Sequence, residues 1–214
     1  MIGEQSARVG DALSGMQAQL ESIYDLHTPH RVESFVTSNA DWLRALGEQP
    51  ERTEEMLLVH AEGEDLNVSL YLSQAVLAGL SDEHDPNPNM MALEGVSHFL
   101  YVVWRAARDH GMSRLELELQ AEVDKFLALS ADRADLRSLH DDLFSRVSFR
   151  ENLSTEDRAL YQEANRQAAR YCWDLVSRFG EGEHPGRQRE LRRFYRLGLE
   201  SKVNMINGMG AGGP

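Results

Sequence analysis

From residue 90 onwards, the apolar residues of this chain recur at steps of three and four, the period of an α-helix with one buried face. Residues 90–109 are apolar almost all round, which is typical of a helix in the centre of a core. The same period predicts further helices over about 114–130, 133–146, 155–179 and 188–206. Most of the chain therefore has to fold as packed helices.

The period changes between residues 56 and 72. Apolar residues there alternate with polar ones from Leu66 to Leu72, after a polar turn that contains Gly63. Alternation on either side of such a turn predicts an antiparallel β-hairpin. Because an isolated hairpin is marginally stable in water, we expect it to pack on helices or to pair with residues 31–37. The predicted fold class is mainly α, of α+β type: a multi-helix, bundle-like core with a small antiparallel hairpin in the N-terminal part.

Composition along the chain suggests four parts. Residues 1–80 form an N-terminal α+β part that contains the hairpin 56–72. Residues 81–89, with two prolines and many polar neighbours, are typical of a linker. Residues 90–207 form the helical part, and the glycine-rich residues 208–214 are predicted to be a flexible tail. A length of 214 residues suits one compact domain overall.

Cysteine count and charge exclude several classes of protein. Cys172 is the one cysteine, so neither an intramolecular disulfide nor a zinc ribbon can form. The longest apolar run, Phe99–Trp104, is far shorter than the roughly 20 residues that cross a membrane. No secretory signal pattern is present, so we expect a cytoplasmic protein without a membrane partner. A net charge of −13 disfavours nucleic acid as a partner.

Two of the predicted helices carry polar residues on their apolar faces. The short connection between 90–109 and 114–130 predicts an antiparallel pair. Steps of four, three and four then place one stripe on the first helix opposite two carboxylates on the second: Glu94, His98, Tyr101 and Arg105 against Glu118 and Glu122. Because a carboxylate on an apolar face costs several kcal/mol unless it is paired, we expect Arg105 or Tyr101 to hold Glu122.

This cluster has three possible roles. Glu94, His98 and Glu122 are candidate catalytic residues, since a glutamate with a raised pKa beside a histidine suits general acid–base chemistry. Tyr101, Arg105 and Glu118 would then bind the ligand. Glu94, His98 and Glu122 could instead hold a metal, although the paired Glu-x-x-His motifs of di-iron bundles are missing. The third possibility is a structural network that fixes the register of the two helices. The sequence names no cofactor.

The predicted last helix carries a basic face in an acidic chain. Residues 187–202 hold six positive and two negative charges. Four arginines share one side of the helix and are called the arginine stripe: Arg189, Arg192, Arg193 and Arg196. Such a face can bind an acidic protein or a small anionic ligand. It can also be a solvated face that pairs with the acidic first two-thirds of the same chain.

The sequence supports two classes of function. The first is a non-catalytic binding or adaptor protein that uses the arginine stripe, with a homo-oligomer left open. The second is an enzyme, or a protein that binds a small molecule or metal, with its site in the Glu94–Glu122 cluster. We favour the first class because no specific catalytic motif is present.

Overall fold

The computed structural model describes residues 2–63, 65–80, 85–131, 133–147, 153–180 and 184–209. The chain divides into two units. Unit 1 consists of Met1–Glu21 and Leu26–His110, and unit 2 consists of Ser22–Asp25 and Gly111–Pro214. The described residues are mainly helical with one small three-stranded sheet, which confirms the predicted fold class. Among them, no helix combines the length and the apolarity that crossing a membrane requires.

Unit 1 contains the sheet. Its order is β1-β3-β2, formed by Val36–Thr37, Asp65–Leu72 and Glu55–Glu62. β2 and β3 form the predicted antiparallel hairpin, and β1 pairs with β3 in parallel, which confirms the expected pairing with residues 31–37. Around the sheet lie α1 (Ile2–Tyr24, ending in unit 2), η1 (Val32–Ser34), α2 (Ala40–Ala45), η2 (Pro50–Arg52), α3 (Gln74–Gly79) and α4 (Asn87–Ala106).

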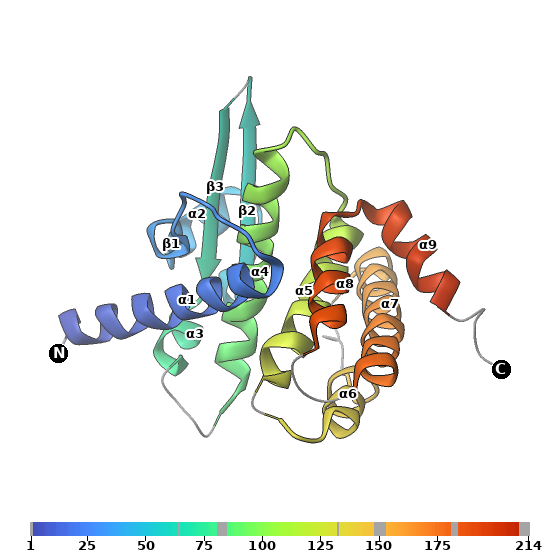
Figure 1. The fold of residues 1–214 in the computed structure, drawn as a ribbon. Helices are drawn as coiled ribbons and strands as arrows, with labels where there is room; N and C mark the ends of the chain where they lie inside the picture. Colours follow the sequence, from blue (N-terminus) through green and yellow to red (C-terminus); the bar gives the residue numbers. More distant parts are fainter. Residues whose placement is uncertain are drawn as a thin grey trace. The chain divides into compact units, whose positions relative to one another are not determined.

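α4 packs against both strands of the hairpin, and Figure 1 shows it running beside them. The contact is close because Gly95 faces the sheet. A Cβ atom at this position would lie 2.7 Å from Leu70 Cδ1 and 3.0 Å from Glu55 Cγ. The absence of a side chain at residue 95 therefore lets the helix approach the sheet. The buried apolar side chains of unit 1 include Leu13, Leu43, Leu70, Val76, Val96 and Phe99.

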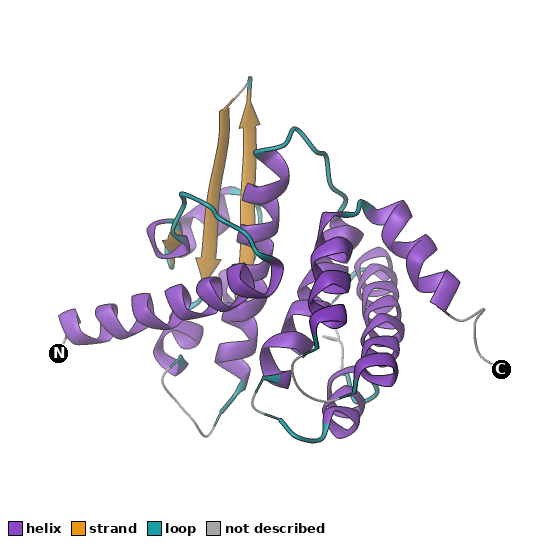
Figure 2. Cartoon of the chain, in the orientation of Figure 1, coloured by secondary structure: helices purple, strands orange, loops and turns teal. Residues whose placement is uncertain are grey.

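In unit 2 the described residues contain helices and no strand (Figure 2). The helices are α5 (Arg114–Ser130), α6 (Leu136–Phe144), α7 (Thr155–Phe179), α8 (Pro185–Arg196) and α9 (Leu199–Met209). α7 packs along α5 and also contacts α6, α8 and α9. The buried apolar side chains of this unit include Leu119, Phe126, Leu139, Ala168, Leu175 and Leu191.

The predicted last helix over 188–206 is wrong in one respect, because the structure has two helices there. Leu197 adopts an extended backbone with φ −78° and ψ 147°, which ends α8. The Glu116 side chain accepts a hydrogen bond from the backbone N–H of Leu199 at 3.1 Å, which satisfies a donor at the start of α9. Gly208, assigned to the tail from the sequence, lies within α9, and residues 210–214 lie outside the described residues.

Other predicted boundaries differ by a few residues. α4 begins at Asn87, and α6 begins at Leu136 behind an Asp135 side-chain cap. The predicted 81–89 linker falls within unit 1, and its residues 81–84 lie outside the described residues, so its role as a linker stays a prediction.

The close approach at Gly95 yields a stability prediction. Gly95→Val should lower the free energy of unfolding by about 2 kcal/mol, because the added atoms overpack a filled contact between α4 and β3. Gly15→Val is the matched control, since Gly15 also lies in a helix and nothing stands within 4 Å of its Cβ position. Urea unfolding followed by circular dichroism measures both. Equal stability of the two variants would contradict the close approach.

Candidate functional site

The histidine of the predicted cluster has its partner in the sheet. His98 Nδ1 lies 3.3 Å from Glu55 Oε1, and their side chains are 6% and 9% exposed. Glu55 is the first residue of β2 and lies two positions before Leu57, on the side of the sheet that meets α4. The sequence analysis missed Glu55, because 43 residues separate it from His98 and no local pattern links them.

The remaining α4 residues of the cluster also lie in unit 1. Tyr101 and Arg105 are buried, and the Arg105 guanidinium lies 5.9 Å from the centre of the Tyr101 ring. Glu94 is half-buried. Glu118 and Glu122 belong to unit 2, so their meeting with Glu94, His98, Tyr101 and Arg105 stays a prediction.

The expected position of Glu122 inside the buried face of α5 is wrong. Glu122 is half-buried, and Lys125 Nζ, three residues along the same helix, donates to it at 2.7 Å. The buried polar residues of α5 are Glu116, Gln120 and Asp124, at steps of four. The buried face of the helix is thus rotated toward these polar residues, relative to the face predicted from the apolar residues alone.

Two of these residues, Gln120 and Asp124, form a buried polar network in unit 2 together with Tyr24 and Lys202. The Tyr24 hydroxyl is hydrogen-bonded to the Asp124 carboxylate. Gln120 Nε2 donates to the Tyr24 hydroxyl at 3.0 Å and to Asp124 at 2.8 Å. Lys202 Nζ donates to Gln120 Oε1 at 2.6 Å. All four residues are at most 1% exposed, so a substrate cannot touch them and the network is structural.

The surroundings of the network change the acidity of Tyr24. Burial raises the pKa of the Tyr24 hydroxyl well above its usual value of 10.0, and the neighbouring Asp124 carboxylate raises this pKa further. Both causes oppose a negative charge on the tyrosine oxygen. Tyr24 therefore acts as a neutral hydrogen-bond donor to Asp124.

The arginine stripe divides into two pairs. Arg192 Nη1 lies 3.5 Å from the Asp25 carboxylate. Arg196 donates to the backbone carbonyls of Tyr24 at 3.2 Å and Asp25 at 3.4 Å. These carbonyls lie at the C-terminal end of α1, where backbone acceptors have no partner within the helix. Arg192 and Arg196 therefore bind other residues of unit 2.

The other half faces outward. Arg189 and Arg193 are exposed, and neither forms a hydrogen bond or ion pair with any residue that the structure describes. Arg193 lines an open groove of about 730 Å³ formed by α7, α8 and α9. The other residues that line it are Trp173, Asp174, Ser177, Arg178, Glu190, Met205, Gly208 and Met209. We call it the α7–α9 groove.

The side chains of the α7–α9 groove offer apolar surface and a balanced set of charges. Trp173 is 44% exposed, and Met205 and Met209 add flexible apolar surface. Arg178 forms ion pairs with both Asp174 and Glu190, the two acidic residues that line the groove. The lining therefore holds two acidic and two basic side chains with a net charge of zero, and Arg193 is the one that forms no ion pair with the described residues.

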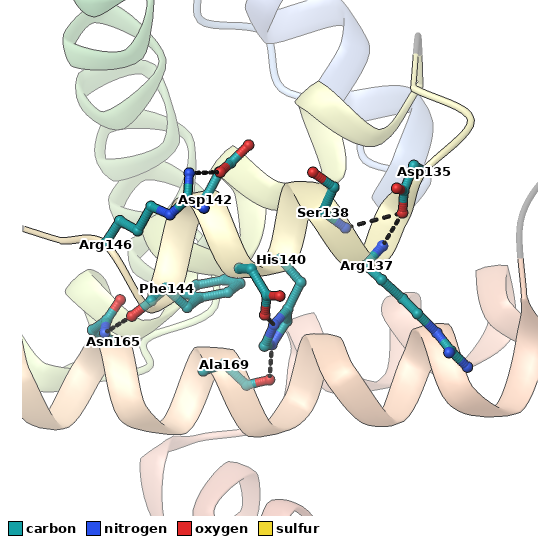
Figure 3. A network of polar contacts seen from close by, with 10 residues as sticks. Asp135, Arg137, Ser138, His140, Asp142, Phe144, Arg146, Asn165 and Ala169 are labelled. Carbon is teal, nitrogen blue, oxygen red and sulfur yellow. Dashed lines mark hydrogen bonds and ion pairs between the residues drawn. The ribbon is translucent and has the colours of Figure 1, made fainter.

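Two side chains of α6 lie close to Trp173, which belongs to α7. The His140 ring lies 5.3 Å from the Trp173 ring, and the Arg137 guanidinium lies 5.8 Å from its centre. Figure 3 shows how α6 is fixed on α7: His140 Nε2 donates to the Ala169 carbonyl at 2.8 Å, and Asn165 Nδ2 donates to the Phe144 carbonyl at 3.1 Å. These bonds hold α6 on α7, the helix that carries Trp173.

Comparison with known proteins finds no matching protein family, no matching curated protein and no matching solved structure.

The two lysines of the chain provide a test of the buried network. Lys202→Met should lower the free energy of unfolding by about 3 kcal/mol, because it leaves buried polar groups without their cationic donor. Lys125→Met is the control, since its ion pair with Glu122 is partly solvated and contributes about 1 kcal/mol or less. Chemical denaturation measures both variants. A smaller loss for Lys202→Met than for Lys125→Met would show that the network does not stabilise unit 2.

The raised pKa of Tyr24 predicts a loss of stability at high pH. Below pH 10 the tyrosine is neutral in both folded and unfolded chains, so its contribution is present in full. Above pH 10 the unfolded tyrosine ionises while the folded one cannot, and the free energy of unfolding falls by up to about 1.4 kcal/mol per pH unit for this group. Denaturation curves between pH 8 and 11 should fall less steeply for Tyr24→Phe. Parallel curves for the two proteins would contradict the assignment.

Proposed function

We propose that this chain is a non-catalytic binding protein of the cytoplasm, an adaptor, and that its docking surface is the α7–α9 groove with Arg189 and Arg193. The observation that carries the proposal is the division of the arginine stripe. Arg192 and Arg196 bind the end of α1, whereas Arg189 and Arg193 make no hydrogen bond or ion pair with the described residues and one of them lines the groove. Exposed cations beside apolar surface favour a partner that offers both chemistries.

The partner that fits is a protein segment with an apolar or aromatic anchor next to acidic residues. The anchor would occupy the space beside Trp173, Met205 and Met209. Carboxylates on the same segment would meet the guanidinium groups of Arg189 and Arg193, which bind carboxylates through paired hydrogen bonds. Aromatic anchors in pockets with charged surroundings supply much of the binding energy of protein interfaces.

The enzyme alternative rests on Glu55 and His98 in unit 1. A histidine beside a carboxylate is the arrangement of a general base and the group that orients it. Both side chains are more than nine-tenths buried, however, so a substrate would reach them only after a rearrangement of α4 and β2. The groove in unit 2 is already open, and we therefore favour the binding protein.

Selection from a random library of phage-displayed 16-residue peptides against the full chain tests the proposal. We expect enriched peptides to combine Asp or Glu with Trp, Phe or Leu. Arg189→Glu with Arg193→Glu should weaken their binding at least tenfold while changing the free energy of unfolding by about 0.5 kcal/mol or less, because both side chains are exposed.

Arg146→Glu with Arg166→Glu is the matched control. It makes the same change in net charge at exposed arginines of unit 2 that do not line the groove. Retained peptide binding in this control and loss in the Arg189/Arg193 variant support the proposal. A library without enriched peptides, or equal binding by both variants, would overturn it.

A further inference from the structure

The hairpin of unit 1 has one edge without a neighbouring strand. The order β1-β3-β2 places β1 and β2 on either side of β3, so no strand among the described residues pairs with the outer edge of β2. The backbone N–H of Ser73 donates to the Glu54 carbonyl. This bond shows which alternate residues of β2 direct their backbone groups toward β3. The backbone groups of Glu55, Leu57, Val59 and Ala61 therefore point away from β3.

Natural sheets protect such edges with proline, lysine, a bulge or a very short strand. β2 has no proline, lysine or bulge and is eight residues long, although an inward-pointing charge, which also protects edges, stands at its first residue, Glu55. Its register with β3 runs without interruption from Glu55↔Leu72 to Glu62↔Asp65, and its centre is the apolar run Met56-Leu57-Leu58-Val59. Val59 is 49% exposed, and Leu66 on β3 is 39% exposed. This part of the hairpin therefore exposes apolar side chains next to the backbone groups of Leu57 and Val59 that point away from β3.

The charge of unit 1 indicates which kind of strand suits this edge. Unit 1 holds six arginines, no lysine and 17 acidic residues, a net charge of −11, out of −13 for the whole chain. Glu54 directly precedes β2 and Glu62 is its last residue, which is exposed. Such a unit attracts basic segments and repels a second copy of itself.

We propose that the free edge of β2 accepts an extended basic segment of a partner protein as a fourth strand of the sheet. The partner's backbone would exchange hydrogen bonds with Leu57 and Val59, as in other cases of strand addition. Its apolar side chains would lie beside Val59, and its lysines or arginines would lie beside Glu54 and Glu62. This site is on a different unit from the α7–α9 groove and takes a partner of opposite charge, so it does not rest on the proposed function.

A panel of nine-residue peptides tests this site on the full chain. Each peptide alternates Val, Ile, Leu or Phe with Thr and carries Lys or Arg at both ends. We expect the panel to contain peptides whose binding slows amide hydrogen exchange at Leu57 and Val59, measured by NMR. An analogue with Glu at both ends, and one with alternate backbone amides methylated, should each bind at least tenfold more weakly.

Val59→Pro blocks the edge in the protein itself. The N–H of Val59 points away from β3, so proline at this position removes an edge donor without removing a bond of the hairpin. We expect binding of the basic peptides to fall at least tenfold. If this variant fails to fold, Val59→Lys replaces it, because a charged side chain there also disfavours strand addition.

Three results would overturn the proposal. The first is a panel in which no basic peptide changes exchange at Leu57 and Val59. The second is equal binding of the basic peptides and their amide-methylated analogues, which would show charge attraction without strand addition. The third is a dimer of the unbound chain, measured by light scattering, that Val59→Pro converts to a monomer, because the occupant would then be a second copy.

Discussion

Unit 2 depends on the buried hydrogen bond between Tyr24 and Asp124. The two residues are 100 positions apart, and the bond fixes the last turn of α1 against α5. Gln120 bonds to both groups, and Lys202 brings α9 to the same place. A buried carboxylate is tolerated only when such donors surround it. α8 ends at the extended Leu197, and the helix that follows, α9, carries the buried Lys202 that donates to Gln120.

The same turn of α1 explains why the arginine stripe is not one uniform surface. Arg192 and Arg196 follow the face of α8 that meets Tyr24 and Asp25, next to the stacked rings of Tyr24 and Tyr195. Arg189 and Arg193 lie further around the helix and are exposed, and Arg193 lines the groove. The two pairs of arginines differ by a few tens of degrees in their direction around the helix axis. This difference is enough for one pair to bind the end of α1 while the other pair stays exposed.

Periodicity was sufficient to predict the hairpin and most helices from α4 onwards, because each of these elements repeats its apolar residues along one face, but it did not show the break at Leu197 between α8 and α9. α7 begins behind Ser154 and β2 pairs with β3 as the pattern predicts. The candidate sites were harder to predict, since their residues are polar and their partners are distant in sequence. Asp124 is hidden in a polar series with Glu116 and Gln120, and nothing near His98 points to Glu55. The arginine stripe was visible, but the division of its contacts depends on a turn near residue 25.

The two units differ in net charge, and this difference affects which partners each unit would bind. Unit 1 carries a net charge of −11, whereas unit 2 holds 16 basic and 18 acidic residues, a net of −2, and one of its exposed arginines, Arg193, lines the α7–α9 groove. A basic strand on β2 and an acidic segment in the α7–α9 groove would not compete, because neither surface suits the other's ligand. If both proposals hold, one chain would bind two partners of opposite charge through separate surfaces.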